Sequence, residues 1–108
     1  MVDQDLVQVT ETEQGIEVEM KSKMLFKSGS ASLAREALKV IRDVARILRP
    51  LPNSIRVEGN TDNIPINTLS FPSNWELSAA RAASVVHLFT KLGMDPGRLS
   101  AIGFGEHR

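Results

Sequence analysis

Two charged side chains, Asp62 and Arg81, could together bind a ligand that carries both a positive and a negative group. Asp62 ends the run Val57–Asp62, and Arg81 lies in the run Asn74–Ala82, after a loop that contains prolines. A carboxylate accepts charge-assisted hydrogen bonds from an ammonium group, and a guanidinium binds a carboxylate through two parallel hydrogen bonds. The head group of an amino acid offers both partners. The pair therefore predicts a binding site for a zwitterion.

The same two residues also have an ordinary structural interpretation. An aspartate that follows a threonine often caps a turn, and an arginine on a helix often makes a surface ion pair worth at most about 1 kcal/mol. Spacing by itself favours this second interpretation. The choice between the two depends on the elements that position Asp62 and Arg81.

The chain is predicted to begin with a β-hairpin. Apolar and polar residues alternate over residues 6–12 and 16–20, and the turn between these runs ends in Gly15, which suits a positive φ. Glu17 and Glu19 fall on one face of the second strand, opposite its apolar residues. This pattern predicts a sheet with one solvated face.

A first helix is predicted from Leu33 to Leu48, because apolar residues recur there at helical spacing. Pro50 and Pro52 end it. The side opposite the apolar residues carries a basic stripe made of Arg35, Lys39, Arg42 and Arg46. We interpret the stripe as a solvated outer face, since aromatic residues that could stack on bases are scarce. Nucleic acid is not an expected partner.

The remaining elements complete a βαβαβ pattern in one domain. A strand at 54–59 should run parallel to the strand that precedes the first helix. A second helix over 73–92 begins with a capping box formed by Ser73 and Glu76. A third strand follows at 99–105. The inward stripe of the second helix is expected to consist of Trp75, Ala79, Ala82, Ala83, Val86 and Phe89.

This arrangement would bring Asp62 and Arg81 to one edge of the sheet. Ligand sites in open α/β sheets gather at the carboxyl ends of strands, where the N-termini of helices also point. Asp62 follows the strand at 54–59, and the second helix begins nearby. Arg81 lies about two turns inside that helix, so the loop at 63–72 must fold over the helix for the pair to meet.

Several short motifs occur along the chain. Residues 24–33 contain "LF-x-SGSA-x-L", residues 59–62 read "G-x-TD", and residues 74–82 read "N-x-x-LS" and, overlapping it, "LS-x-x-RA". Residues 103–106 read "GxGE", whose glycines permit a close approach of the backbone. Together these motifs resemble those of the OmpA-like peptidoglycan-binding domain. The segment 64–78 also resembles the flagellar stator branch of that family, which includes MotB, MotD and PomB. The resemblance covers Met24 to Glu106.

The resemblance implies a fold and a set of ligand-binding residues. The fold would be α+β, a two-layer sandwich with the helices on one face of a mixed sheet. Asp62 and Arg81 would bind the ammonium and carboxylate groups of diaminopimelate in the stem peptide of peptidoglycan. Many members carry histidine where this chain has Asn60, so a role that needs an imidazole is not carried over. The positions that would adjoin the pair are Thr61, Asn74, Leu77 and Ser78.

The resemblance also implies a function. The domain would be a non-catalytic periplasmic module that anchors a flagellar stator unit to the cell wall, pairs with a second copy, and meets a MotA- or PomA-type partner through an upstream membrane helix. An alternative is a dimerisation or protein-interaction domain without wall binding. A hydrolase that uses Glu58 and Asp62 is a third, disfavoured possibility, since a strand face and a turn explain these carboxylates.

The composition excludes several other classes of protein. Lysine plus arginine and aspartate plus glutamate number 13 each, so no long-range field attracts a polyanion. Cysteine is absent, and His87 and His107 have no acidic or thiol neighbours at ligand spacing, so neither a metal nor a cofactor is expected. No apolar run reaches the roughly 18 to 20 residues that span a bilayer.

The family pattern also predicts that the domain, spanning residues 1–108, is cut short. Members continue beyond the "GxGE" segment into a final strand, which the resemblance places inside the sheet. We therefore expect either that the chain is a fragment of a longer domain or that a neighbouring chain fills the gap. Without that strand, the sheet should expose unpaired backbone groups in its middle.

Overall fold

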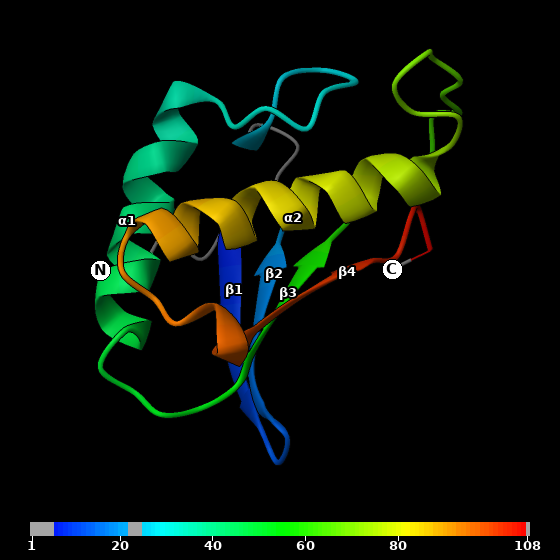
Figure 1. Cartoon of the computed structure of the whole chain (residues 1–108). Coiled ribbons are helices and arrows are strands. Elements are labelled where there is room, and N and C mark those ends of the chain that lie inside the picture. Colours follow the sequence, from blue (N-terminus) through cyan, green and yellow to red (C-terminus); the bar gives the residue numbers. More distant parts are fainter. Residues whose placement is uncertain (1–5, 22–24, 108) are drawn as a thin grey trace.

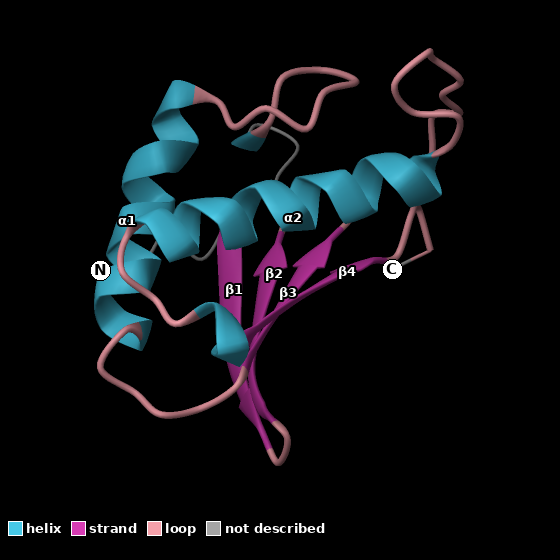
Figure 2. Ribbon diagram, viewed as in Figure 1, coloured by secondary structure: helices cyan, strands magenta, loops and turns pink. Residues whose placement is uncertain are grey.

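The domain has two layers, with a four-stranded sheet covered on one face by two helices (Figure 1, Figure 2). The structure is a computed structural model that describes residues 6–21 and 25–107. Met24, the first residue of one motif, lies outside them. The predicted α+β class is confirmed. The elements, in chain order, are β1 (Val7–Thr12), β2 (Gly15–Met20), α1 (Arg35–Leu48), β3 (Ile55–Gly59), α2 (Asn74–Lys91), the 3-10 helix η2 (Pro96–Arg98) and β4 (Leu99–Gly103).

The sheet is mixed and has no internal gap among the described strands. β1 and β2 form the predicted antiparallel hairpin, with Gly15 at a φ of 143°. β2 pairs in parallel with β3, and β3 pairs in parallel with β4, in the order β1-β2-β3-β4. The expectation of a missing strand inside the sheet was therefore wrong. The crossover through α2 returns the chain directly beside β3, so a further strand could join only at an edge.

The core lies between the inner face of the sheet and the two helices. Its strand residues come from alternate positions, such as Val7, Val18 and Val57, each 0% exposed. The helices add Ile41 and Phe89, which are also fully buried. Alternation in the strands and a spacing of three to four residues in the helices direct these side chains to the same layer.

The outer face of the sheet is polar, as predicted, but one of its glutamates is buried. Glu58 is 2% exposed, although the sequence pattern predicted a solvated position. Arg56 Nη2 lies 2.7 Å from Glu17 Oε2 and 3.2 Å from Glu58 Oε2. Because β2 and β3 place Glu17 and Arg56 directly opposite each other, the guanidinium can bridge both carboxylates.

Helix α2 lies directly on the ends of β3 and β4 because two glycines leave room for its backbone. A Cβ on Gly59 would stand 2.1 Å from the carbonyl oxygen of Ser78, and a Cβ on Gly103 would stand 2.5 Å from the amide nitrogen of Ala79. The predicted close approach at the "GxGE" segment is confirmed for Gly103.

The inward face of α2 differs from the predicted stripe. Ala82 and Phe89 are buried as expected, but Trp75 is 54% exposed and Ala79 is exposed too. The prediction followed apolar residues alone, whereas the buried face of this helix carries polar side chains near its N-terminus. Its buried residues are Asn74, Leu77, Ser78, Arg81, Ala82, Val85 and Phe89.

Candidate functional site

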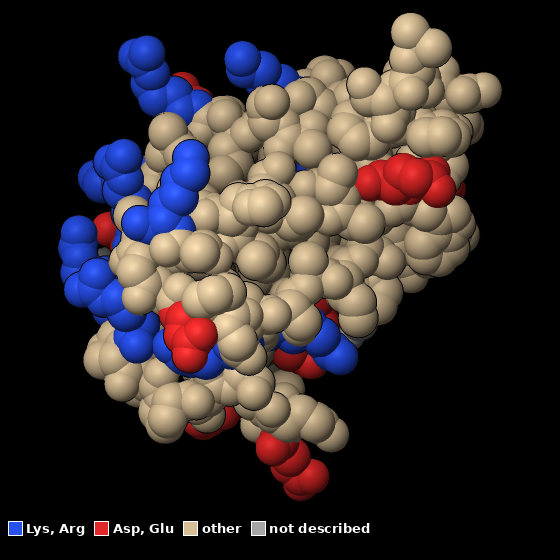
Figure 3. Space-filling model, in the orientation of Figure 1, with Lys and Arg blue, Asp and Glu red and all other residues tan. Residues whose placement is uncertain are grey.

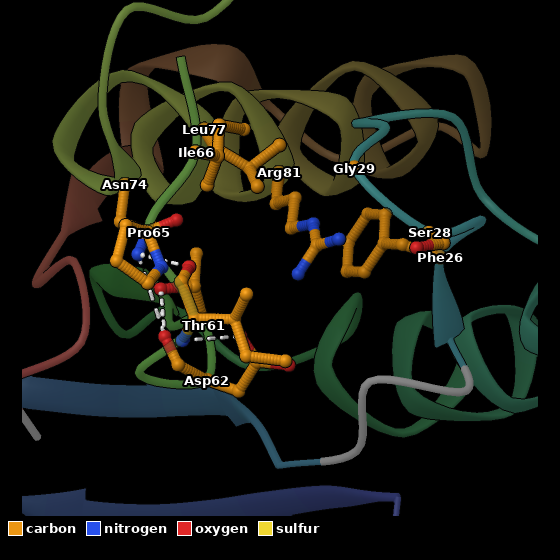
Figure 4. Close-up of a pocket in the computed structure, with 11 residues that line it drawn as sticks. Phe26, Ser28, Gly29, Thr61, Asp62, Pro65, Ile66, Asn74, Leu77 and Arg81 are labelled. Carbon is orange, nitrogen blue, oxygen red and sulfur yellow. Dashed lines mark hydrogen bonds between the residues drawn. The ribbon is translucent and has the colours of Figure 1, made fainter.

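A cavity of about 520 Å³ opens between α2, the loop that follows β3 and the turn that precedes α1 (Figure 4). It lies at the carboxyl end of β3, where the sequence predicted a site. The lining residues come from these three segments, and they are Phe26, Ser28, Gly29, Thr61, Asp62, Ile64, Pro65, Ile66, Asn74, Leu77 and Arg81.

The Arg81 side chain is held rigidly on one side of this cavity. It is 5% exposed, and its Nε donates a hydrogen bond of 2.9 Å to the carbonyl oxygen of Ser30. Its Nη2 lies 3.5 Å from the carbonyl oxygen of Lys27, and its guanidinium carbon stands 4.9 Å from the centre of the Phe26 ring. Among the described residues, none accepts a hydrogen bond from Nη1. That nitrogen is therefore available to a ligand carboxylate.

Burial lowers the pKa of Arg81, and the negative charge of Asp62 partly offsets this effect. A guanidinium remains charged far above neutral pH, so a lowered pKa does not remove its charge. A charge that is poorly solvated gains more from a bound carboxylate than an exposed one does. The environment of Arg81 therefore suits recognition of an anion.

Asp62 stands on another side of the same cavity and is exposed. Its Oδ1 accepts a hydrogen bond of 3.1 Å from the backbone N–H of Ile64, so it caps the turn as the ordinary interpretation proposed. Its Oδ2 has no partner within the described part of the chain. Within the described part of the chain, Asp62 and Arg81 form no ion pair with each other. Figure 4 shows the two side chains apart on different sides of the cavity. The ordinary interpretation of Arg81 as half of a surface ion pair is therefore wrong.

The loop after β3 folds over the N-terminal part of α2, as we expected if Asp62 and Arg81 are to line one site. Asn74 holds it there, since its Nδ2 donates to the carbonyl oxygens of Ile64, at 3.1 Å, and Asp62, at 3.5 Å. The Asn74 side chain is 6% exposed, and its Oδ1 has no partner in the described residues. Asn74 thus fixes the loop that carries Asp62.

The other predicted site residues do not all reach the cavity. Thr61 and Leu77 line it, but Ser78 does not. Ser78 is fully buried, and its hydroxyl accepts a hydrogen bond of 2.9 Å from the N–H of Gly105. Asn60 also points elsewhere, since its Nδ2 donates to Glu19 Oε2 on the outer face of the sheet at 3.3 Å.

Several lining residues were not predicted as site residues from the sequence. Phe26, Ser28 and Gly29 come from the turn before α1, and Ile64, Pro65 and Ile66 come from the loop after β3. These residues belong to segments that matched the family motifs, but their side chains suggested no role in binding. Nothing in the local pattern placed Phe26 against a residue 55 positions later in the chain.

The described residues contain no group of histidine, cysteine, aspartate or glutamate side chains that could hold a metal ion. His87 and His107 are both exposed, and His107 stacks on Trp75 with ring centres 5.1 Å apart. Glu58 bonds to Arg56 on the outer face of the sheet, so it does not form a catalytic carboxylate pair with Asp62. Across residues 6–21 and 25–107, neither helix is long and apolar enough to cross a membrane.

Comparison with known proteins supports one family. The model of the OmpA family matches residues 25–108. The chain is 39% identical over 95 residues to the uncharacterized protein YtxE of Bacillus subtilis, and 33% identical over 100 residues to Motility protein B of the same organism. These matches cover 87% and 90% of this chain but only 39% and 38% of the relatives. The chain thus spans about two fifths of the length of these relatives.

Solved structures agree with this assignment. The periplasmic domain of Helicobacter pylori MotB superposes with a TM-score of 0.79 at 28% identity, over 94% of this chain and 67% of that one. The cell wall anchor of the T6SS from Pseudomonas aeruginosa gives a TM-score of 0.81 at 36% identity, over 95% and 72%.

The family explains why the cavity holds no catalytic set. Domains of this type are non-catalytic structural modules, which confirms the prediction that the domain is not an enzyme. With its two-layer fold, its sequence motifs and these matches, the chain belongs to the OmpA family as a MotB-type domain.

Proposed function

We propose that this domain binds peptidoglycan by the zwitterionic head group of diaminopimelate in the stem peptide. Asp62 receives the ammonium group and Arg81 receives the carboxylate. The observation that carries the proposal is that two opposite charges line one cavity from different sides and form no ion pair with each other. A ligand with both charges completes both sets of hydrogen bonds at once.

The shape and order of the site support this assignment. A volume of about 520 Å³ lies in the range of about 300 to 1,000 Å³ typical of sites for small ligands. Arg81 is fixed by two backbone carbonyls, and Asp62 is fixed by the turn that it caps. Because both groups are positioned before a ligand arrives, binding loses little conformational freedom in the protein.

The names of the relatives support a biological setting for this site. We infer that the domain lies in the periplasm, belongs to a membrane-anchored protein, and attaches a flagellar stator unit to the cell wall. A homodimer and a MotA- or PomA-type partner, reached through residues outside this chain, belong to the same proposal. Matched proteins from several organisms carry the name Motility protein B or MotB, and the T6SS neighbour is described as a cell wall anchor.

The test is co-sedimentation of the purified domain with insoluble peptidoglycan sacculi. Asp62→Asn removes the charge of an exposed side chain, and Arg81→Lys keeps the charge but removes the bidentate fork. We expect each variant to bind at least about tenfold more weakly than the wild type, since hydrogen bonds to charged groups contribute about 1.5 to 3 kcal/mol.

Asp95→Asn is the matched control, because Asp95 caps η2 through Gly97 and does not line the cavity. It should bind like the wild type. Wild-type protein that fails to sediment would favour the interaction-domain alternative. Release of soluble wall fragments would favour the hydrolase.

A further inference from the structure

The turn that follows β4 connects the two walls of the cavity. We propose that Ser78 is a positioning residue, which fixes Asp62 relative to Arg81 by holding Gly105. This role rests on the proposed function, because the two groups that Ser78 positions are the proposed ligand contacts. Ser78 itself does not line the cavity.

Two hydrogen bonds form the connection. The N–H of Gly105 donates to the Ser78 hydroxyl at 2.9 Å, and the carbonyl oxygen of Gly105 accepts from the N–H of Thr61, also at 2.9 Å. Thr61 directly precedes Asp62. Gly105 is buried and has a φ of 63°, a conformation that glycine adopts without strain. One peptide segment therefore joins α2 to the turn that carries Asp62.

The same two hydrogen bonds connect Arg81 to Asp62. Ser78 lies three residues before Arg81, so one rigid helical turn fixes the relative positions of these two residues. From Ser78 the path runs through Gly105 and Thr61 to Asp62. The separation of the carboxylate and the guanidinium is thus set by a helix and two hydrogen bonds, and not by the loop alone.

The Ser78 hydroxyl is itself locked in one orientation. It donates to the carbonyl oxygen of Trp75 at 3.0 Å, which leaves its lone pairs for the N–H of Gly105. A Cβ on Gly103 would stand 2.5 Å from the Ser78 Oγ, so the strand end leaves just enough space for this side chain. Alanine at position 78 would leave the buried N–H of Gly105 without its acceptor.

Backbone amide hydrogen exchange, measured by NMR on Ser78→Ala, tests this positioning without any ligand. We expect exchange at Thr61 and Ile64 to accelerate by about tenfold, since a lost buried hydrogen bond shifts a local equilibrium by about that factor. The Ile64 N–H reports on Asp62 because it donates to Asp62 Oδ1. The amide of Leu92, at the far end of α2, should exchange at the wild-type rate.

Thr90→Ala is the matched control. Thr90 also lies on α2, and its hydroxyl donates to the carbonyl oxygen of Val86 at 3.0 Å, far from Gly105. This variant should leave exchange at Thr61 and Ile64 unchanged. Ser78→Cys, whose thiol is larger than the hydroxyl and a weaker acceptor, should give an intermediate result and replaces Ser78→Ala if that variant does not fold.

Sacculus binding then separates positioning from general destabilisation. Ser78→Ala should weaken binding by about five- to tenfold in the wild-type background and have no further effect in the Asp62→Asn background. Equal losses in both backgrounds, or unchanged exchange at Thr61 and Ile64, would overturn the positioning role. If the wild type fails to bind sacculi, the proposed function fails, while the exchange experiment still decides whether Ser78 positions Asp62.

Discussion

At the scale of single residues, Arg81 has two kinds of partner. Its Nε and Nη2 bind the backbone of the turn before α1, and the residue also lines the cavity. The same side chain therefore serves the fold and the proposed site. Weaker sacculus binding by Arg81→Lys must therefore be compared with the stability of that variant, and Asp62→Asn tests the site without changing these backbone contacts.

Arg81→Ala should lower the free energy of unfolding by about 1 to 3 kcal/mol, because the carbonyl oxygens of Ser30 and Lys27 lose their donor. Urea denaturation followed by circular dichroism measures this change. Arg42→Ala, on the exposed side of α1, is the control and should change stability by less than about 0.5 kcal/mol. Equal stabilities of Arg81→Ala and the wild type would contradict the structural role.

The contact between Ser73 and Glu76 at the N-terminus of α2 makes a prediction about pH. The Ser73 hydroxyl donates to the Glu76 carboxylate, and this bond is the main cause of a lowered pKa of Glu76 relative to 4.5. A depressed pKa in the folded state contributes stability above about pH 4.5, and this contribution is lost as the pH falls through the folded value.

Urea denaturation of wild type and Glu76→Gln at neutral pH, and at about one pH unit below 4.5, tests this prediction. The stability difference between the two proteins should be larger at neutral pH and should shrink in acid. A difference that stays constant between the two conditions would show that the ionised carboxylate does not support the cap.

At the scale of elements, the packing of α2 against the ends of β3 and β4 determines where the site forms. Gly59 and Gly103 let the first turns of α2 touch the strand ends, and this contact brings Leu77 and Arg81 beside the loop that carries Asp62. The helix and the strand ends act as one unit. Any side chain inserted between them must displace α2.

Gly59→Ala should destabilise the domain by about 2 kcal/mol or more, since its Cβ would collide with the Ser78 carbonyl oxygen. Gly97→Ala is the control, because its Cβ would meet only the Asp95 side chain, at 3.3 Å. Thermal unfolding at equal protein concentration distinguishes the two. A similar melting temperature for both variants would show that α2 can shift without cost.

At the scale of the whole molecule, the charges are balanced in number but segregated in space. Lysine and arginine side chains gather over α1 at the left of Figure 3, away from the loop that follows β3. The chain carries no net charge at neutral pH, so attraction to the wall by a long-range field is not expected. Binding should depend on contacts within the cavity.

Sedimentation with sacculi should therefore resist salt. An increase from about 0.1 M to about 0.5 M salt should weaken binding by less than about threefold, because screening acts most strongly on exposed, separated charges. The double variant Arg42→Glu with Arg46→Glu should bind like the wild type. Loss of binding in that variant, or steep salt dependence, would assign the interaction to the basic stripe of α1.

Short-range sequence patterns predicted the elements and much of their order. Alternation at 6–12 and 16–20 predicted the hairpin, and helical spacing predicted both helices. Ser73 with Glu76 correctly placed the start of α2, and the "GxGE" glycines predicted a close backbone approach. These features depend on neighbours a few residues apart, which a sequence pattern records directly.

The contacts between residues far apart in the chain depend on how the elements pack in three dimensions. Arg81 bonds to Ser30, 51 positions away, and Asn60 turns toward Glu19, 41 positions away. Glu58 is buried and bonds to Arg56 on its own strand, and Ser78 bonds to Gly105 rather than lining the cavity. Periodicity reports the side of an element on which a residue lies, but the partner on that side depends on how the elements pack.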